Sequence, residues 1–383
     1  MKARVIAYYL PQFHPVKEND EMWGKGFTEW TNVAKAKPLY RGHYQPQIPA
    51  DLGFYDLRMP EIREEQARLA KEAGIEGFCY WHYWFGNGRR ILERPFNEVL
   101  ESGKPDFPFC LGWANHSWSN KTWQKLNRFQ QDTTFIKQEY LGEEDYTMHF
   151  NTVLPAFKDK RYITVDDKPL FLIFDPDAIP DVEFFIELWN KLAKQNGLKG
   201  IHFVARGVST GKFSLKSNKN EINKNVKRIY DGLIAKGFDA IAPSTMRQAE
   251  VMVKGYYRKI LNTFLNRYSL QLGKDAYDYE KIIKYLYNDQ DERLDVYPQL
   301  VPRYDKTPRK GRDAEFYYNN SPEAFKRSVE MALDRVKDKP FEKRILFVFA
   351  WNEWGEGAYL EPDIKYGHEF LDALKDALEG EFE

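Results

Sequence analysis

Eight short apolar segments that alternate with helical stretches constrain the fold of this chain most. They lie at residues 4–10, 75–80, 107–113, 169–174, 201–205, 238–242, 298–301 and 344–350. Short runs that are rich in β-branched and aromatic residues are typical of strands buried on both faces. Strands that alternate with helices in this way predict a parallel sheet.

The number of these strand–helix units favours one closed α/β barrel. Eight units fit a (β/α)8 TIM barrel, which is typically about 250 residues long and can exceed about 400 with insertions. The chain has 383 residues. A doubly wound sheet is disfavoured because no glycine-rich phosphate-binding fingerprint follows the first strand. We therefore predict a single catalytic barrel domain over residues 1–383, with inserted loops and helices at its carboxyl face near residues 119–166, 207–228 and 246–292.

Five helices are expected at residues 59–73, 94–101, 182–195, 321–336 and 369–378. The fourth has a well-marked start, because Ser321, Pro322 and Glu323 supply an N-cap, a first-turn proline and an acid in sequence. Residues 11–58 predict a long loop after the first strand.

The charge balance and the cysteines narrow the class of protein. Lys+Arg and Asp+Glu both number 57, so the net charge is zero, which argues against a general basic surface for nucleic acid. Cys79 and Cys110 lie in apolar segments and are expected to be buried free thiols, which suits a reducing compartment. No signal-peptide core is present and no stretch approaches about 18 apolar residues. The sequence therefore predicts a cytoplasmic protein with no membrane span.

Two glutamates, Glu353 and Glu356, follow the last predicted strand. In a (β/α)8 barrel the residues after each strand meet at the carboxyl face, where active sites are built. Glycoside hydrolysis uses two carboxyl groups on either side of the scissile bond, one of them with a raised pKa so that it can donate a proton. We therefore predict that Glu353 and Glu356 are catalytic. Their spacing does not distinguish retaining from inverting chemistry.

Tryptophans accompany these acids. Nine of the ten, all but Trp189, lie at strand ends or in the loops that leave them. Indole rings form flat apolar walls with a polar edge, which suit sugars, although we expect about half of the nine to be structural because buried aromatics are usually core. The predicted substrate-binding residues are Tyr9, His14, Trp30, Trp81, His82, Trp84, Trp113, Asn115, His116, Trp118, Arg303, Trp351, Asn352 and Trp354.

The sequence contains only weak evidence for a metal-binding site. His14, His82 and His116 follow three different strands, and no paired His or Cys motif is present. The segment Asp175-Pro176-Asp177 resembles the start of a calcium loop but lacks the remaining ligand positions. No metal or cofactor is predicted, and the expected partner is an oligosaccharide or polysaccharide substrate.

Five segments resemble known carbohydrate-active proteins. Residues 351–357, WNEWGEG, resemble the NEWxEG signature of glycoside hydrolase family 99, the endo-α-1,2-mannosidase and mannanase family. The chain looks still more like the WbsX-type, family-99-like proteins found with surface-polysaccharide and O-antigen genes. The matching segments are 7–14 (AYYLPQFH), 23–32 (WGKGFTEWTN), 77–85 (GFCYWHYWF) and 109–115 (FCLGWAN). His116 stands where many relatives carry a glutamate, which indicates that the substrate here differs.

The resemblance implies a mechanism that the spacing alone does not give. It implies a retaining glycoside hydrolase that is endo-acting on an α-linked, mannan-like bacterial polysaccharide and forms no covalent bond to the enzyme. By this likeness Glu353 takes the proton of the sugar 2-hydroxyl, which attacks the anomeric carbon to form a 1,2-anhydro sugar. Glu356 protonates the leaving oxygen. Two alternatives stay open: a glycosyltransferase or accessory enzyme of O-antigen or capsular polysaccharide biosynthesis, with Asp175 and Asp177 as candidate metal ligands, and a non-catalytic glycan-binding barrel.

Overall fold

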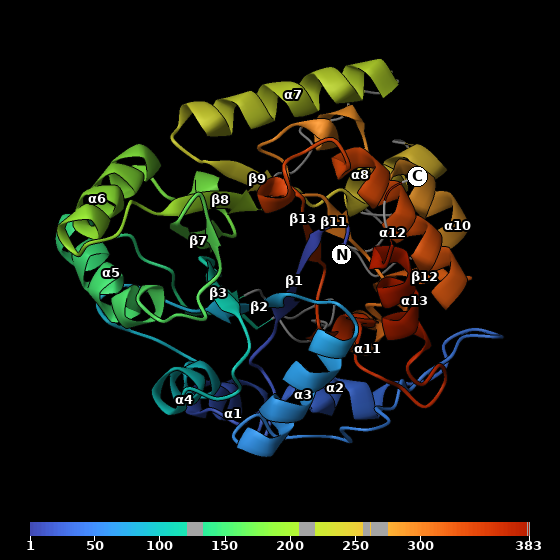
Figure 1. Ribbon diagram of the computed structural model, residues 1–383. Coiled ribbons are helices and arrows are strands. Elements are labelled where there is room, and N and C mark those ends of the chain that lie inside the picture. Colours follow the sequence, from blue (N-terminus) through green and yellow to red (C-terminus); the bar gives the residue numbers. More distant parts are fainter. Residues whose placement is uncertain (121–132, 207–218, 256–260, 262–274, 381, 383) are drawn as a thin grey trace.

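The computed structural model describes residues 1–120, 133–206, 219–255, 261, 275–380 and 382. Its centre is a parallel sheet that curls into a barrel (Figure 1). The barrel strands are β1 (Arg4–Tyr9), β2 (Gly77–His82), β3 (Phe109–Trp113), β7 (Lys168–Ile173), β8 (His202–Arg206), β9 (Ala240–Ala242), β11 (Gln299–Leu300) and β13 (Ile345–Val348). Each overlaps one of the eight predicted segments, with ends that differ by at most two residues at either side, and the predicted (β/α)8 fold is confirmed.

The sheet closes through the segment that precedes β11. Neighbouring strands follow the order β11, β13, β1, β2, β3, β7, β8 and β9, and each adjacent pair is parallel. The backbone of Ile241 in β9 donates to the carbonyl of Asp295 and accepts from the N–H of Tyr297, both at 2.8 Å. Because residues 299–300 pair with β13, this segment joins the two edges. The carboxyl ends of all eight strands therefore meet at one mouth.

Helices surround the barrel (Figure 1). They are α3 (Pro60–Glu72), α4 (Arg94–Ser102), α5 (Glu143–Phe157), α6 (Val182–Gln195), α7 (Lys219–Ala235), α12 (Pro322–Val336) and α13 (Glu369–Leu378). The five predicted helices all form, with ends within one residue of those expected. At the start of α12 the Ser321 hydroxyl accepts from the N–H of Ala324 at 3.2 Å, as its N-cap position predicts.

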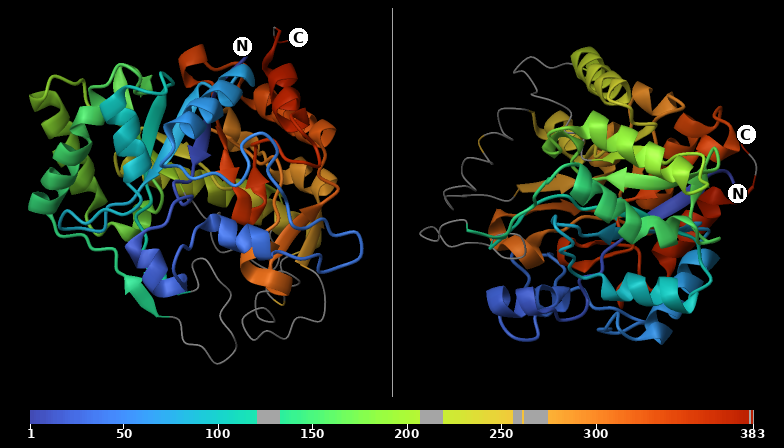
Figure 2. Two further views of the ribbon diagram at one scale, coloured as in Figure 1. Left: turned by 90° about the horizontal axis from the view of Figure 1, so that it is seen from below. Right: turned by 90° about the vertical axis from the view of Figure 1, so that its left-hand side faces the viewer.

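Shorter elements lie in the connecting segments. They are α1 (Lys17–Trp23), α2 (Glu29–Lys35), α8 (Met246–Lys254), α10 (Tyr279–Ile282), α11 (Thr307–Lys310), β4 (Trp118–Ser119), β5 (Thr134–Ile136), β6 (Thr164–Val165), β10 (Asp275–Asp278), β12 (Glu315–Tyr318), β14 (Asn352–Glu353) and β15 (Ala358–Tyr359). Residues 11–58 were expected to be one loop, and this is wrong because they contain α1 and α2. A reciprocal capping contact between Thr28 and Thr31 starts α2. Figure 2 shows α2 lying beside α11, although the two are far apart in sequence.

The three expected insertions differ in what they contain. Residues 119–166 include α5, which packs against α6 on the outside of the barrel. Residues 207–218 lie outside the described part of the chain, and α7 follows them. Residues 246–292 include α8 and α10, with 256–260 and 262–274 outside the described part. Of the helices that the structure describes, none is long and apolar enough to cross a membrane.

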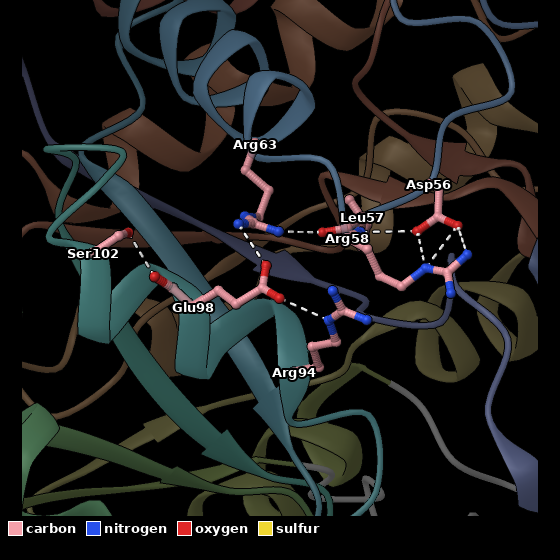
Figure 3. Close-up of polar contacts among 7 residues, drawn as sticks. All are labelled: Asp56, Leu57, Arg58, Arg63, Arg94, Glu98 and Ser102. Carbon is pink, nitrogen blue, oxygen red and sulfur yellow. Dashed lines mark hydrogen bonds and ion pairs between the residues drawn. The ribbon is translucent and has the colours of Figure 1, made fainter.

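A polar network joins α3 to α4 on the outside of the barrel (Figure 3). Arg63 of α3 is 3 % exposed, and its Nη2 atom lies 2.9 Å from Oε2 of Glu98 in α4. The other carboxylate oxygen of Glu98 accepts from Nε of Arg94 at 2.7 Å. Because a buried guanidinium is costly without a partner, the contact between Arg63 and Glu98 holds the two helices together.

Candidate active site

A cavity of about 600 Å³ opens at the mouth of the barrel. Each of the eight strands contributes a residue from its carboxyl end or just beyond it: Leu10, Trp81, Ala114, Phe174, Arg206, Ser244, Tyr304 and Phe349. Its volume lies in the range of small-molecule sites. The carboxyl face is where (β/α)8 enzymes place their chemistry, so this cavity is the candidate active site.

Glu353 and Glu356 both line this cavity. Glu353 ends β14, which pairs antiparallel with β15, and Glu356 ends the single 3₁₀ turn Trp354–Glu356 that follows. This compact turn places both carboxyl groups at the barrel mouth. The predicted catalytic residues are therefore neighbours in space as well as in sequence.

Arg309 of α11 joins these two acids to a third, Glu29 at the start of α2. Its Nε atom lies 2.9 Å from Oε1 of Glu29, its Nη1 atom lies 2.7 Å from Oε1 of Glu356, and its Nη2 atom pairs with Glu353. Nζ of Lys306 lies 3.0 Å from the same Glu356 oxygen. Glu29 is fully buried and Arg309 is 7 % exposed, so the ion pair between them is shielded from water. The three acids and two cations form one connected group, which we term the Arg309 cluster.

The close approach of Glu29 explains why residue 355 is glycine. A Cβ atom at Gly355 would lie 1.5 Å from Oε1 of Glu29 and 2.8 Å from Nε of Arg309. No side chain fits in that space. The absence of a Cβ atom thus lets Glu29 reach Arg309 directly beneath the turn that carries the two catalytic candidates.

Burial and the charges of the Arg309 cluster shift the pKa values of Glu353 and Glu356 in opposite directions. Burial raises the pKa of Glu353 to about 7, although Arg309 opposes the shift. Burial also acts to raise the pKa of Glu356, but Lys306 and Arg309 outweigh it and lower that pKa to about 2. Between these values the pair holds one proton, and in the free protein that proton lies on Glu353. One protonated and one ionised carboxyl group is the state that acid–base catalysis requires.

Two of the predicted substrate-binding residues, Trp81 and His116, line the cavity with these acids. The His116 ring packs near Phe174, with 5.2 Å between ring centroids. Burial lowers the pKa of His116 to about 4, so this side chain is neutral at physiological pH. His116 can therefore offer a hydrogen bond to a sugar hydroxyl without adding charge.

The other predicted substrate-binding residues are buried and do not line this cavity. They are Tyr9, His14, Trp30, His82, Trp84, Trp113, Asn115, Trp118, Arg303, Trp351, Asn352 and Trp354. Asn352, for example, uses its amide to accept from the N–H of Leu10 at 2.8 Å and donate to the Leu10 carbonyl at 3.0 Å. Arg303 pairs with the buried Asp363. Such contacts stabilise the structure around the cavity. We therefore limit the proposed substrate contacts to Trp81 and His116.

Most of the tryptophans that were expected to line the site thus pack in the hydrophobic core. Trp84 stacks on His149 of α5 with ring centroids 4.7 Å apart and donates from Nε1 to Asp145 at 3.2 Å. Nε1 of Trp354 donates to the buried Glu361 at 2.5 Å. Trp123 lies outside the described residues. Trp81 is the one tryptophan among the described residues that reaches the cavity.

Several cavity residues were absent from the sequence-based site. They are Tyr83, Arg206, Arg247, Glu250, Lys306, Arg309 and Glu315. Arg206 carried a signal, because it directly follows the fifth predicted strand. Glu29 also carried one, since it lies in a segment that resembles the WbsX-type proteins. Arg309 had none, because its helix lies in a loop between two barrel strands.

The aspartates considered as metal ligands, Asp175 and Asp177, do not line the cavity. Asp177 is exposed and pairs with Lys236, with Oδ1 and Nζ 3.0 Å apart. The backbone of Asp175 is held by Asn115, whose amide accepts from its N–H at 2.8 Å and donates to its carbonyl at 2.7 Å. Across the described ranges, no three His, Cys, Asp or Glu side chains gather as a metal site would require.

Sequence comparison places this chain among bacterial relatives. It matches the family model described as "Glycosyltransferase WbsX" over residues 5–374. It is 32 % identical over 383 residues to two proteins named "Uncharacterized protein WxcX", from Xanthomonas campestris pv. campestris strains B100 and ATCC 33913. The alignments cover 99 % of this chain and 50 % of each relative, so the chain spans about half the length of the curated relatives it matches.

Solved structures share the fold. A "Glycoside hydrolase-like protein" has a TM-score of 0.60 at 14 % identity, covering 99 % of this chain and 94 % of that one. The GH99 endo-alpha-mannosidase from Bacteroides thetaiotaomicron has a TM-score of 0.53 at 12 % identity, covering 98 % and 96 %. Its complex with BIS-TRIS-Propane scores 0.52 at 12 % identity, covering 98 % and 95 %. At this level of identity the likeness establishes the barrel architecture.

Proposed function

The chain belongs to the WbsX family, and from this premise we propose that it is a retaining glycoside hydrolase of the family-99-like type. The proposed substrate is an α-linked, mannan-like bacterial polysaccharide, cleaved within the chain. The observation that carries the proposal is the pair Glu353 and Glu356, which share one cavity with pKa values shifted in opposite directions. The fold neighbours named as endo-alpha-mannosidases support the same reaction class.

The proposed reaction uses the sugar's own hydroxyl as nucleophile. Glu353 as carboxylate takes the proton of the 2-hydroxyl while that oxygen forms a bond to the anomeric carbon. The glycosidic bond breaks, and its oxygen takes the proton of Glu356. Water then opens the 1,2-anhydro sugar: Glu356 accepts the water proton and Glu353 returns its proton to the 2-oxygen. Both carboxyl groups end in their starting states, and the two steps retain the anomeric configuration.

The proton must change places when substrate binds. In the free protein it lies on Glu353, whereas the proposed route starts with the proton on Glu356. A sugar that enters between Glu356 and its cations Lys306 and Arg309 weakens the ion pairs that keep this carboxyl group ionised. Both arrangements are forms of the same singly protonated pair, so the total number of protons is unchanged.

The pair predicts a pH dependence that does not depend on which carboxyl group is the acid. As pH rises through about 7, the shared proton leaves the pair because the folded pKa of Glu353 lies there. We therefore expect kcat/KM to be level below this pH and to fall about tenfold per pH unit above it, since only the singly protonated pair is active. The measurement is kcat/KM from about pH 5 to pH 9, with the melting temperature followed over the same range. A level profile up to about pH 9 would contradict the assignment.

Direct cleavage tests the proposed function. Bacterial surface polysaccharides and α-mannans are incubated with the protein and with the double variant Glu353→Gln/Glu356→Gln, and products are analysed by mass spectrometry. We expect new reducing ends with the unaltered protein alone, and NMR of the first product should show a retained anomeric configuration. Equal cleavage by the double variant, or no cleavage of any α-linked glycan by the unaltered protein, would refute the proposal.

A glycosyltransferase is the second candidate, favoured by the family's description and by two cavity cations, Arg206 and Arg247, that could face a diphosphate. For this function we expect binding of a nucleotide sugar, and a loss of that binding without Mn²⁺ and in Asp175→Ala would assign a metal to this aspartate. Titration calorimetry with GDP-mannose and UDP-glucose, with and without Mn²⁺, measures this. Binding of either donor together with failure of the cleavage assay would favour the transferase.

A further inference from the structure

We propose that the cavity contains a subsite for an anionic group on the glycan, a carboxylate or a phosphate, which binds Arg206. The inference refines the proposed function by naming the substrate class, and it rests on that function for the substrate being a glycan. Its basis is the environment of Arg206, which differs from that of the cations in the Arg309 cluster.

Arg206 ends β8 and lies at the cavity wall. It is 7 % exposed, and three aromatic rings surround its guanidinium carbon: Tyr8 at 4.7 Å, Phe174 at 5.1 Å and Trp81 at 5.3 Å to the ring centroids. Tyr8 also stacks on Trp81, with 4.9 Å between centroids, so the rings form a continuous support. These contacts fix the position of the guanidinium group and leave its N–H groups as the polar part of this wall.

The charge of Arg206 has no carboxylate partner among the residues the structure describes. No acid lies within 4.0 Å of it there, and its buried Nε atom has no hydrogen-bond partner. The nearby Tyr8 hydroxyl does not neutralise it, because burial raises the pKa of Tyr8 far above physiological pH. His116, which shares Phe174 with Arg206, is neutral as well. By contrast, Lys306 and Arg309 are each paired with glutamates.

A largely buried guanidinium that is surrounded by aromatic rings and has no carboxylate partner is unfavourable unless an anion binds it. The planar guanidinium group presents two parallel N–H donors that match a carboxylate or a phosphate. Trp81 lies beside it and can pack on the apolar face of the same sugar. A sugar acid or a sugar phosphate therefore satisfies both the charge and the apolar surface, whereas a neutral sugar satisfies only the latter.

Ligand-observed NMR with three monosaccharides tests this inference independently of catalysis. The probes are D-glucuronate, D-glucose 6-phosphate and D-glucose, titrated into the protein of residues 1–383. We expect at least one anionic sugar to bind about 10- to 100-fold more tightly than glucose, the range for a charge-assisted hydrogen bond. Whichever probe binds identifies the group as carboxylate or phosphate. Equal affinity for all three would overturn the proposal.

Variants locate the effect at Arg206. Arg206→Gln should abolish the preference for the anionic sugar, and Arg206→Lys, which keeps the charge but loses the paired donors, should retain a weaker preference. The matched control is Arg68→Gln, which alters an exposed arginine paired with Glu65 and Glu72 on α3. Melting temperatures check folding, and the Lys variant carries the test if the Gln variant unfolds. An unchanged preference in the folded Gln variant would overturn the proposal.

The outcome separates the subsite from the proposed function. If the anionic sugar binds through Arg206 but no glycan is cleaved, the subsite stands and the hydrolase proposal fails. If glycans are cleaved while neutral and acidic sugars bind alike, the hydrolase stands and the subsite fails.

Discussion

Glu353→Gln and Glu356→Gln are each expected to lower kcat/KM on a natural glycan by about 10³-fold, within the range for loss of a general acid or base. Glutamine keeps the size of the side chain and its hydrogen bonding but cannot exchange a proton near neutral pH. Each variant leaves Arg309 with Glu29 and one further glutamate as partners, so we expect the fold to persist. The control is Glu330→Gln on the exposed side of α12, which should leave kcat/KM unchanged.

An activated leaving group separates the two roles. In a 2,4-dinitrophenyl glycoside the leaving group is dinitrophenolate, which departs without protonation. A variant that lacks the general acid should therefore regain most of its activity with this substrate. With this substrate we expect kcat/KM of Glu356→Gln to be less than about tenfold below that of the unaltered protein. We expect Glu353→Gln to keep its loss of about 10³-fold in kcat/KM. The reverse pattern would make Glu353 the acid, in keeping with its protonation in the free protein. Losses of about 10³-fold for both variants on both substrates would contradict the division of roles.

The fold could be predicted because its signals are local. A buried strand is marked by its own apolar run, and α6 and α13 by their own amphipathic spacing. The two acids were found for the same reason, since Glu353 and Glu356 directly follow the eighth strand. Closure of the barrel also follows from counting such segments.

The walls of the site could be predicted only in part, and the alternation of side chains at the end of β2 and in the two residues after it shows why. Side chains along a strand point to opposite faces in turn. Trp81 and Tyr83 line the cavity, whereas His82 and Trp84 point outward, where they contact His149 of α5. The predicted substrate-binding set, which includes Trp81, His82 and Trp84 together, ignored this period of two.

The Arg309 cluster could not be predicted from any local pattern. Glu29, Arg309 and Glu353 come from three segments, separated by hundreds of residues or by several strands, and only the closed barrel brings them together. The opposite pKa shifts arise from this meeting. The sequence therefore identifies the two acids, whereas their protonation depends on tertiary contacts.

Gly355→Ala is expected to lower both the stability of the protein and its kcat/KM strongly, although it adds only one methyl group. The new Cβ atom would lie 1.5 Å from Oε1 of Glu29, which is fully buried and held by Arg309 at 2.9 Å. The carboxylate must move away from Arg309 or the turn must move. Breaking a buried ion pair costs about 3 to 5 kcal/mol. Displacement of Glu353 and Glu356 should also lower kcat/KM about 10²-fold or more, because small misplacements of reacting groups are costly.

The matched control for this substitution is Gly232→Ala in α7. Gly232 is exposed, and a Cβ atom there meets nothing within 4 Å. Alanine is the better helix former by about 1 kcal/mol, so this variant should be as stable as the parent or more stable, with unchanged kcat/KM. Chemical denaturation and steady-state kinetics of both variants make the comparison.

If Gly355→Ala matched the parent in both measurements, the close approach of Glu29 would not be what positions the catalytic turn. If it lost activity but kept its stability, the turn rather than the ion pair would have moved, because Glu29 and Arg309 would then still be paired.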